Sequence, residues 1–293
     1  MKNAASTHSI YFGDAVDVLR DCIAPESVQL IVTSPPYWNV RDYGHPGQIG
    51  FPDTLDGYLV RLDAVWQEVV RVMLPDGKLA VNIGNIYYSE PDETRRTTAN
   101  LSVLVWEHLS RFPDLRFMGT IYWQKTTSRQ GAVLFGSYPY PANFMISNAV
   151  EPIFVFRKTG KRKVTRELKE RSKISLAEFR RFRDAIWQIN GAAADKHTAA
   201  FPVELPRRLI TMYSFRGDTV LDPFLGSGTT TMAALAEHRN SIGIEINPEF
   251  FSLMQEKLGC VKKSPGQAAA RVKVLYTATG KSETYYAGEN SKS

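Results

Sequence analysis

The sequence predicts an α/β fold with a mostly parallel, doubly wound sheet, and three observations support that fold class. Short apolar runs alternate with stretches of helical periodicity along most of the 293 residues. The run from Val28 to Val32 is largely apolar on both faces, as in a parallel strand covered by helices. Two turns rich in glycine or proline follow such runs, at the strand ends where open α/β sheets bind their ligands.

The elements of the first half follow from periodicity. Apolar residues recur every three or four positions from Leu55 to Leu74, which predicts an amphipathic helix ending at the turn Pro75-Asp76-Gly77. By the same criteria we expect strands at 9–12, 28–32, 79–83, 118–123 and 153–156, and helices at 15–23, 55–74 and 101–109. Residues 126–150 and 157–197 lack this alternation and are interpreted as insertions.

The alternation resumes after Gly191. We expect a helix at 202–213 with proline near its start, a strand at 219–221, a helix at 229–237, a strand at 241–244 and a helix at 248–258. The stretch from Lys263 is polar, and its last residues are typical of a disordered segment. The chain therefore divides into 1–156, an inserted region at 157–196, a segment at 197–262, and a polar, partly disordered tail at 263–293.

The composition excludes several classes of protein. Hydrophobic residues make up 43% and charged residues 23%, which are ordinary values for a globular chain. No run of about 18 apolar residues occurs, and the polar segment Met1 to Ser9 lacks the apolar centre of a secretion signal. Two separate cysteines and five scattered histidines make neither a disulfide framework nor a metal site. We therefore expect a cytoplasmic protein without metal and without a membrane span.

Positive charge is concentrated in one segment. The net charge is +6, yet the window from Arg157 to Arg183 contains twelve Lys or Arg against three Glu, which leaves the rest of the chain at −3. One interpretation is a solvated helical surface. The other is a patch that contacts nucleic-acid phosphates. The second interpretation assigns phosphate contacts to Arg157, Lys158, Lys161, Arg162, Lys163 and Arg166.

A glycine turn between a strand and a helix is the first candidate ligand site. Gly226-Ser227-Gly228 follows the strand expected at 219–221. Glycines let the backbone approach a ligand, and the next helix offers free N–H groups. Glu245 lies 17 residues beyond Gly228, at the end of the next expected strand, where a carboxylate can accept hydrogen bonds from both ribose hydroxyls. The segment therefore indicates an adenosine-type ligand.

Other interpretations of this turn fit less well. A nucleoside-triphosphate loop requires Lys after the second glycine, and none follows here. A nicotinamide site would have glycine where Thr231 stands. A structural turn explains an isolated Gly-x-Gly, but the longer string Asp222-Pro223-Phe224-Leu225-Gly226-Ser227-Gly228-Thr229-Thr230 is much more specific.

The second candidate site is Ser34-Pro35-Pro36-Tyr37, directly after the strand expected at 28–32. An exocyclic amine of a nucleobase is a poor nucleophile because its lone pair is delocalised into the ring. A rigid Pro-Pro turn supplies a fixed carbonyl acceptor, Ser34 adds a hydroxyl, and Tyr37 offers a face on which a base can stack. A base in a duplex reaches such a pocket only when it is flipped out.

Taken alone, Pro-Pro-Tyr is equally typical of a structural turn, and the glycine motif in the same chain favours the catalytic interpretation. Together the two motifs resemble those of bacterial DNA methyltransferases that use S-adenosylmethionine to methylate N4 of cytosine or N6 of adenine. The resemblance extends from about Ile10 to Leu258. It implies a Rossmann-like S-adenosylmethionine-dependent methyltransferase fold. Because the Ser-Pro-Pro-Tyr motif comes first, the order resembles the circularly permuted, β-group arrangement.

The resemblance also implies roles for individual residues. In this family Asp14 would lie near the adenine of the cofactor, Phe224 beside the cofactor and Glu245 on its ribose, and the segment 197–202 would close over it. The cofactor-binding set is then Asp14, His197, Phe201, Asp222, Phe224, Gly226, Ser227, Gly228, Thr229 and Glu245. For His197, a position at the entry of the next helix without ligand contact is an equally good interpretation.

The same resemblance gives functions to the divisions of the chain. Residues 1–156 become the catalytic half, 157–196 the target-recognition region and 197–262 the cofactor-binding half. The recognition region coincides with the basic window. Trp187 in that window is expected in the core rather than on a base.

One position departs from the family pattern. Related proteins often carry Asp near the end of the strand that here reads Val81-Asn82-Ile83-Gly84-Asn85. Either Asn82 or Asn85 can orient the amine or the cofactor, but neither is a base.

The choice of target base depends on Ser34. Serine before Pro-Pro is typical of the N4-cytosine enzymes of this family, so the expected activity is site-specific N4 methylation of cytosine in double-stranded DNA, with a cognate restriction endonuclease as the expected partner. N6-adenine methylation is the alternative, because both bases present an amine beside a ring acceptor. A nucleic-acid-binding protein without catalysis is a third interpretation, which the intact Ser34, Tyr37 and Glu245 disfavour.

Overall fold

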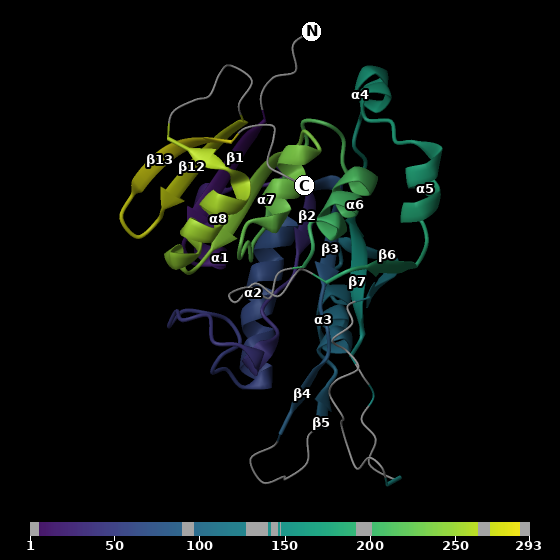
Figure 1. Ribbon diagram of the computed structural model, residues 1–293, viewed down its shortest axis with the longest axis vertical. Coiled ribbons are helices and arrows are strands. Elements are labelled where there is room, and N and C mark those ends of the chain that lie inside the picture. Colours follow the sequence, from purple (N-terminus) through teal and green to yellow (C-terminus); the bar gives the residue numbers. More distant parts are fainter. Residues whose placement is uncertain are drawn as a thin grey trace.

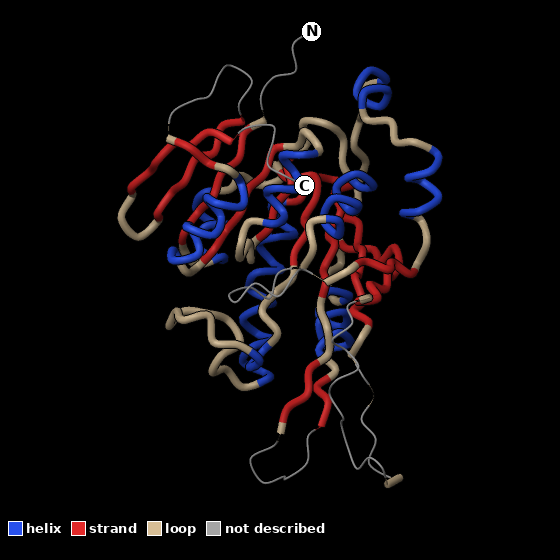
Figure 2. The backbone as a smooth tube through the Cα atoms, in the orientation of Figure 1, coloured by secondary structure: helices blue, strands red, loops and turns tan. Residues whose placement is uncertain are grey.

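The computed structural model describes residues 6–89, 97–126, 140–141, 146, 148–191, 201–262 and 270–287. Within these ranges the chain folds around one large sheet with the strand order β11-β13-β12-β1-β10-β9-β2-β3-β7-β6-β8 (Figures 1 and 2). Its strands are β1 (Thr7–Phe12), β2 (Val28–Thr33), β3 (Met73–Asn82), β6 (Leu115–Lys125), β7 (Val150–Lys158), β8 (Ile186–Ile189), β9 (Thr219–Asp222), β10 (Asn240–Glu245), β11 (Cys260–Val261), β12 (Ala270–Tyr276) and β13 (Lys281–Ala287).

The remaining elements surround this sheet. The helices are α1 (Ala15–Cys22), α2 (Leu55–Val72), α3 (Leu101–Ser110), α4 (Arg166–Arg171), α5 (Leu176–Phe182), α6 (Glu204–Tyr213), α7 (Thr229–Ala236) and α8 (Phe251–Leu258), with 3-10 turns at Trp38–Val40 and Pro248–Phe250. A separate antiparallel pair, β4 (Ile86–Tyr88) and β5 (Thr97–Ala99), extends from one end of the molecule (Figure 1).

The centre of the sheet is parallel, as predicted. β1, β10, β9, β2 and β3 are neighbours in parallel register. Ile31 of β2 stands between Leu221 of β9 and Leu79 of β3, and all three side chains are fully buried. β7 then pairs antiparallel with both β3 and β6. The α/β class with a mostly parallel sheet is confirmed.

Helices cover both faces of this sheet. Successive residues of a strand point to opposite faces, and Ile31 packs in the cluster of α1, α2 and α3, whereas Val32 packs in the cluster of α6 and α7. In the first cluster α2 contributes a stripe of buried side chains that includes Leu62, Trp66 and Val69. α8 covers the far end of the sheet, against β1 and β12. The doubly wound arrangement follows from this division.

The strand order reverses between β9 and β2. From β9 the chain crosses through α7 to β10 on one side, and from β2 it crosses through α2 to β3 on the other. Two neighbouring parallel strands whose connections diverge leave a crevice at their carboxyl ends. Ser34 follows β2 and Asp222 ends β9, so both sequence motifs meet at this crevice.

The end of the described chain differs from the expectation of a polar tail. Residues 270–276 and 281–287 form the hairpin β12–β13, and β12 pairs in parallel with β1. Val272 and Val274 are buried while Arg271 and Lys273 are exposed. This is the alternation of a strand with one covered face, and its polar members obscured it in the sequence. Residues 288–293 lie outside the described residues.

The basic window is also less separate than predicted. β8, which lies just past it, pairs in parallel with β6 at the edge of the main sheet. Trp187 of β8 is 1% exposed, and its Nε1 donates to the carbonyl of Phe182 at 3.0 Å. The core position predicted for Trp187 is confirmed. α4, by contrast, lies at the end of the molecule opposite β4 and β5 (Figure 1).

Candidate active site

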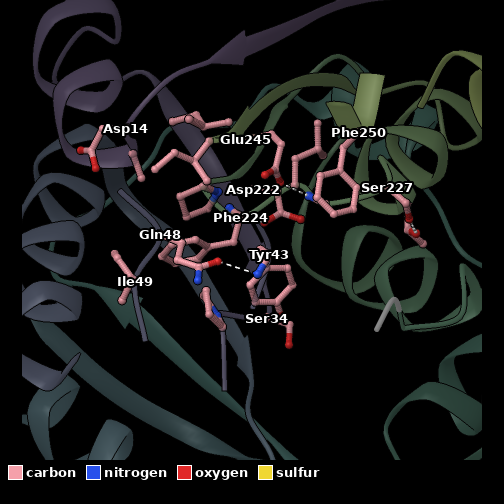
Figure 3. Close-up of a pocket in the computed structure, with 18 of the residues that line it drawn as sticks. Asp14, Ser34, Tyr43, Gln48, Ile49, Asp222, Phe224, Ser227, Glu245 and Phe250 are labelled. Atoms are coloured by element: carbon pink, nitrogen blue, oxygen red, sulfur yellow. Dashed lines mark hydrogen bonds between the residues drawn. The ribbon is translucent and has the colours of Figure 1, made fainter. Parts of the chain in front are cut away.

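An open pocket occupies the crevice between β9 and β2 (Figure 3). Residues from both halves of the chain face it, and those predicted from the sequence are Asp14, Ser34, Pro36, Phe201, Asp222, Phe224, Gly226, Ser227, Thr229 and Glu245. Of the other predicted residues, Pro35 and Gly228 are buried next to it and His197 lies outside the described residues.

Glu245 is fixed at the end of β10 by two backbone donors. The N–H of Gly226 donates to its Oε2 at 2.8 Å, and the N–H of Asn247 donates to its Oε1 at 3.0 Å. Burial raises the pKa of this carboxyl group. Each carboxylate oxygen can accept more than one hydrogen bond, so Glu245 retains acceptor capacity toward the pocket.

The glycine turn has the backbone conformation that glycine favours. Gly226 and Gly228 have φ angles of 55° and 85°, in the left-handed region. Gly228 is the N-cap of α7, so the first N–H groups of this helix follow the turn directly. Nζ of Lys257 donates to Ser227 Oγ at 2.5 Å and to Thr229 Oγ1 at 3.0 Å, which orients both side chains.

Asp222 joins the two motifs. Its buried carboxylate accepts from Thr33 Oγ1 at 2.7 Å, from Thr230 Oγ1 at 2.6 Å and from the N–H of Phe224 at 3.1 Å. Burial raises its pKa to about 6 despite these donors. Because Thr33 directly precedes Ser34, the hydrogen bond from Thr33 holds the catalytic turn against the cofactor turn.

Asp14 combines a local role with its place in the pocket. Its Oδ1 caps α1 by accepting from the N–H groups of Val16, at 2.8 Å, and Asp17, at 3.2 Å. The preceding Gly13 donates its N–H to the carbonyl of Glu245 at 3.0 Å. The ends of β1 and β10 are therefore held together at the pocket.

Sequence reasoning missed the loop that follows the catalytic turn. Arg41, Tyr43, Gln48 and Ile49 line the pocket. The N–H of Tyr43 donates to Gln48 Oε1 at 2.6 Å (Figure 3), and Asn247 Nδ2 donates to the Tyr43 carbonyl at 2.9 Å. Irregular loops have no hydrophobic period, so only these long-range contacts reveal that the loop belongs to the site.

Ser34 and Tyr37, the predicted catalytic residues, follow the end of β2. Ser34 lines the pocket, and its Oγ donates to the Tyr37 hydroxyl at 3.4 Å. The carbonyl of Pro36 accepts from the Tyr58 hydroxyl at 2.8 Å, which fixes the turn against α2. Burial, with a smaller effect from Glu151, holds the pKa of Tyr37 well above its usual range, so its hydroxyl stays protonated.

The two asparagines after β3 have different positions. Asn82 is buried, and its Nδ2 donates to the Tyr37 hydroxyl at 2.9 Å and to Glu151 Oε2 at 3.0 Å. Asn85 instead accepts from Ser102 at the start of α3, at 2.8 Å from Oγ. Asn82 therefore belongs to the site and Asn85 does not. Glu151 was not predicted, and its only signal in the sequence is an acid at the start of an apolar strand.

Comparison with known proteins identifies the family. The model of the DNA methylase family N6_N4_Mtase matches residues 28–256. The chain belongs to this family. It is a DNA methyltransferase of the type II, N4/N6 class, and S-adenosylmethionine is its methyl donor.

Relatives cover nearly the whole methyltransferase. It is 34% identical over 295 residues to the Type II methyltransferase M.MjaI of Methanocaldococcus jannaschii, covering 89% of this chain and 94% of that one. A DNA modification methylase from Thermus thermophilus, solved in complex with S-adenosyl-L-methionine, is 33% identical to this chain with a TM-score of 0.70. The match covers 85% of this chain and 92% of that one. The cytosine-N4-specific PvuII DNA methyltransferase has a TM-score of 0.60 at 23% identity, covering 86% of each chain, and supports the fold.

The residues present fit this cofactor. The pocket combines the aromatic side chains of Phe224 and Phe250 with the carboxylates of Asp222 and Glu245. Aromatic faces suit an adenine ring, and carboxylates suit ribose hydroxyls and a positively charged ligand. Among the described residues, no three His, Cys, Asp or Glu side chains are grouped to bind a metal ion. None of the described helices has the length and apolar character that crossing a membrane requires.

Two of the six predicted phosphate contacts have structural partners instead. Nζ of Lys158 donates to the carbonyls of Val70, at 2.9 Å, and Met73, at 2.8 Å, and so caps the end of α2. Arg162 forms a bidentate pair with the buried Asp218 at 2.7 and 2.6 Å. Lys158 and Arg162 therefore have roles in the fold, and their contact with DNA stays a prediction.

The start of the basic window lies away from the end of β3. Arg157 pairs with Lys78, four residues before the end of β3, whereas Ile153 pairs with Asn82, its last residue. Because β3 is parallel to β2, Arg157 lies further than Ile153 from the carboxyl ends of these strands, where Ser34 follows β2. Nη1 of Arg157 also lies 3.6 Å from Asp76 Oδ1. Lys161, Lys163 and Arg166 are exposed, so they stay predicted DNA contacts.

Proposed function

We propose that this methyltransferase transfers a methyl group from S-adenosylmethionine to the exocyclic N4 of a cytosine that is flipped out of double-stranded DNA at a specific sequence. The observation that carries the proposal is Ser34, which lines the same pocket as Asp222, Phe224 and Glu245. Serine at this position is typical of the N4-cytosine enzymes of the family, and the choice of cytosine depends on it.

The contacts around the turn support this chemistry. When bound, the cofactor supplies an electrophilic methyl group on a sulfonium sulfur. Ser34 Oγ can accept an N–H of the target amine, which directs the nitrogen lone pair away from the ring. The ring of Tyr37, fixed through its hydroxyl, provides the stacking face. Phe224 and Glu245 would hold the adenosine part, and Asp14 and Phe201 complete that side of the pocket.

We further propose that the protein is the modification enzyme of a restriction–modification system. Relatives that match most of the chain are Type II methyltransferases. Its partner would be a restriction endonuclease with the same recognition sequence, and both would act in the cytoplasm, where cellular DNA is accessible.

One assay tests the proposed reaction. Pooled unmethylated genomic DNA is incubated with methyl-labelled S-adenosylmethionine and digested, and the labelled nucleoside is identified by chromatography. We expect N4-methylcytosine in the reaction with wild-type protein and none with the Ser34→Ala variant. N6-methyladenine as the product would overturn the choice of cytosine. A protein that binds the cofactor but labels no DNA would contradict the proposed enzymatic activity.

A further inference from the structure

A chain of hydrogen bonds leads from the pocket to a buried carboxylate. Ser34 Oγ donates to the Tyr37 hydroxyl at 3.4 Å, and the Tyr37 hydroxyl donates to Glu151 Oε2 at 3.0 Å. Ser34 is the end of this chain that lines the pocket. Glu151 is 7% exposed. The link between Ser34 and Tyr37 is the longest, as is common in ligand-free sites.

The direction of these hydrogen bonds is fixed by Glu151 and Asn82. An ionised carboxylate can only accept, so the Tyr37 proton must point toward Glu151. Asn82 Nδ2 donates to the same Tyr37 oxygen at 2.9 Å. With its own proton committed, the Tyr37 oxygen acts as an acceptor toward Ser34 as well. The Ser34 proton therefore points away from the pocket, and the Ser34 oxygen presents its remaining lone pair to a ligand.

The surroundings of Glu151 hold its carboxylate in place. Its Oε1 forms an ion pair with Nζ of Lys125, and its Oε2 also accepts from Asn82 Nδ2 at 3.0 Å. A buried carboxylate is stable only with such partners. On the remaining side, a Cβ on Gly84 would lie 3.0 Å from Glu151 Oε1, so glycine leaves the space that Glu151 occupies. Tyr37 and Lys125 are the titratable groups that face it.

Glu151 lies beside the end of β3. Asn82 is the last residue of β3, and its neighbour across the β3–β7 pair is Ile153. Glu151, two residues before Ile153, brings a carboxylate from β7 to the same place. The negative charge is thus present at the site but comes from the adjacent strand.

We propose that Glu151 is a positioning residue for methyl transfer. It acts through the Tyr37 hydroxyl and orients Ser34 as a hydrogen-bond acceptor for the target amine, while Lys125 serves as its counter-ion. A protonated Glu151 could itself donate to Tyr37 and reverse the chain, so the arrangement requires the ionised form. This inference rests on the proposed role of Ser34 and deepens it.

The first experiment is a double-mutant cycle. The variants Glu151→Gln, Tyr37→Phe and their combination are compared with wild type in single-turnover methylation of the pooled DNA at saturating cofactor. We expect each single change to slow methyl transfer by about 10²-fold relative to wild type. The double variant should also be slowed by only about 10²-fold, because both changes interrupt the same chain of hydrogen bonds. The dissociation constant of S-adenosylmethionine should stay within about threefold, and Glu107→Gln, an exposed glutamate on α3, is the matched control.

The second experiment distinguishes orientation from simple support of the fold. Glu151→Gln keeps the size of the side chain but replaces a carboxylate that only accepts hydrogen bonds with an amide that also donates. Single-turnover transfer should fall by about 10²-fold in this variant, whereas the midpoint of urea unfolding and the dissociation constant of S-adenosylmethionine should stay near their wild-type values. A loss of folding stability in proportion to the loss of transfer would assign Glu151 to support of the fold.

The outcomes separate this inference from the proposed function. Full activity of Glu151→Gln in an enzyme that methylates DNA would overturn the inference and leave the proposed function intact. Effects of the two single changes that multiply in the double variant would also overturn it. A wild-type protein that methylates no DNA would contradict the proposed function itself.

Discussion

Two buried carboxylates govern the pocket at the scale of single residues. Asp222 and Glu245 end the neighbouring strands β9 and β10, and burial raises the pKa of each. Both accept hydrogen bonds from backbone N–H groups of the turn between them, Phe224 for Asp222 and Gly226 for Glu245. The turn that is predicted to bind the cofactor is therefore held from both sides by groups whose charge depends on pH.

The pKa of Asp222 predicts how stability changes with pH. It is about 6 in the fold against an ordinary value of 3.8, so the folded protein binds this proton more tightly than the unfolded chain. The contribution of this proton to the free energy of unfolding is fully present below about pH 4 and is lost as pH rises through 6. As pH rises from 4 to 7, the free energy of unfolding of Asp222→Asn should therefore increase relative to that of wild type by about 2 kcal/mol. Urea unfolding of both proteins across this range measures it, and parallel pH curves would contradict it.

Glu245 gives a prediction for cofactor binding. Glu245→Gln removes a charged acceptor and places an NH₂ group near the N–H of Gly226 or Asn247, which donate to the native carboxylate. We expect the dissociation constant of S-adenosylmethionine to rise by about 10- to 100-fold, the usual effect of losing a charged hydrogen bond. Titration calorimetry measures this. The control is Glu249→Gln, which changes an exposed acid four residues further along the chain. An equal loss of affinity for S-adenosylmethionine in both variants would contradict a specific role of Glu245.

At the scale of elements, the hairpin β12–β13 extends the half of the sheet that carries the predicted cofactor site. β12 covers the free edge of β1, and Val272 and Val274 join Ile10 and Phe12 in one buried cluster. β1 ends at Gly13 and Asp14, which line the pocket. The last described strands therefore support the site without contacting it.

The packing of β12 against the core can be tested by one pair of substitutions. Val272 is 1% exposed and Lys273, its neighbour on the other face, is exposed. Val272→Ala should lower the free energy of unfolding by about 2 kcal/mol, whereas Lys273→Ala should change it by less than about 0.5 kcal/mol. Denaturant unfolding compares the two variants. Equal stabilities would mean that β12 does not pack on the core.

Elements with a strong hydrophobic period could be predicted from the sequence, and others could not. The helix expected at 55–74 is α2, and the strand expected at 28–32 is β2, because apolar spacing alone determines their buried faces. β12 alternates just as regularly, but Arg271 and Lys273 made the segment resemble a tail. The loop at 41–49 has no period, and its place at the pocket depends on Asn247, which lies about 200 positions later.

At the scale of the whole molecule, the site depends on contacts between distant parts of the chain. Ser34, Tyr37 and Glu245 could be predicted because each follows a recognisable strand. Glu151 could not, since it meets Tyr37 only through the antiparallel pairing of β7 with β3. The structural partners of Lys158 and Arg162 could not be predicted for the same reason, since α2 and Asp218 are remote from them in the sequence.

The exposed charges at one end of the molecule predict a salt effect. If Lys161, Lys163 and Arg166 contact phosphates, changing all three to Gln should weaken DNA binding and reduce the slope of log affinity against log salt by up to about 0.9 per contact. Fluorescence anisotropy with duplex DNA measures both. An unchanged slope would assign these residues to a solvated surface.

Arg162→Gln is the matched control for that experiment. It removes one positive charge from the same segment but leaves the buried Asp218 without its bidentate partner. We expect it to lower the free energy of unfolding by about 3 kcal/mol with little change in the salt slope. A reduction of the salt slope by about 0.9, the value of one phosphate contact, would instead indicate that Arg162 binds DNA.

The position of β1 between β10 and β12 has a consequence for synthesis on the ribosome. Ile10 is translated early, but its partners Gly243 and Val274 follow more than 230 residues later. At about 5–20 residues per second, β1 waits roughly 10–50 s for its neighbours. During that interval its apolar side chains have no native surface to cover them. The nascent chain should therefore bind ribosome-associated chaperones, and a ribosome stalled before β10 should carry no cofactor-binding activity.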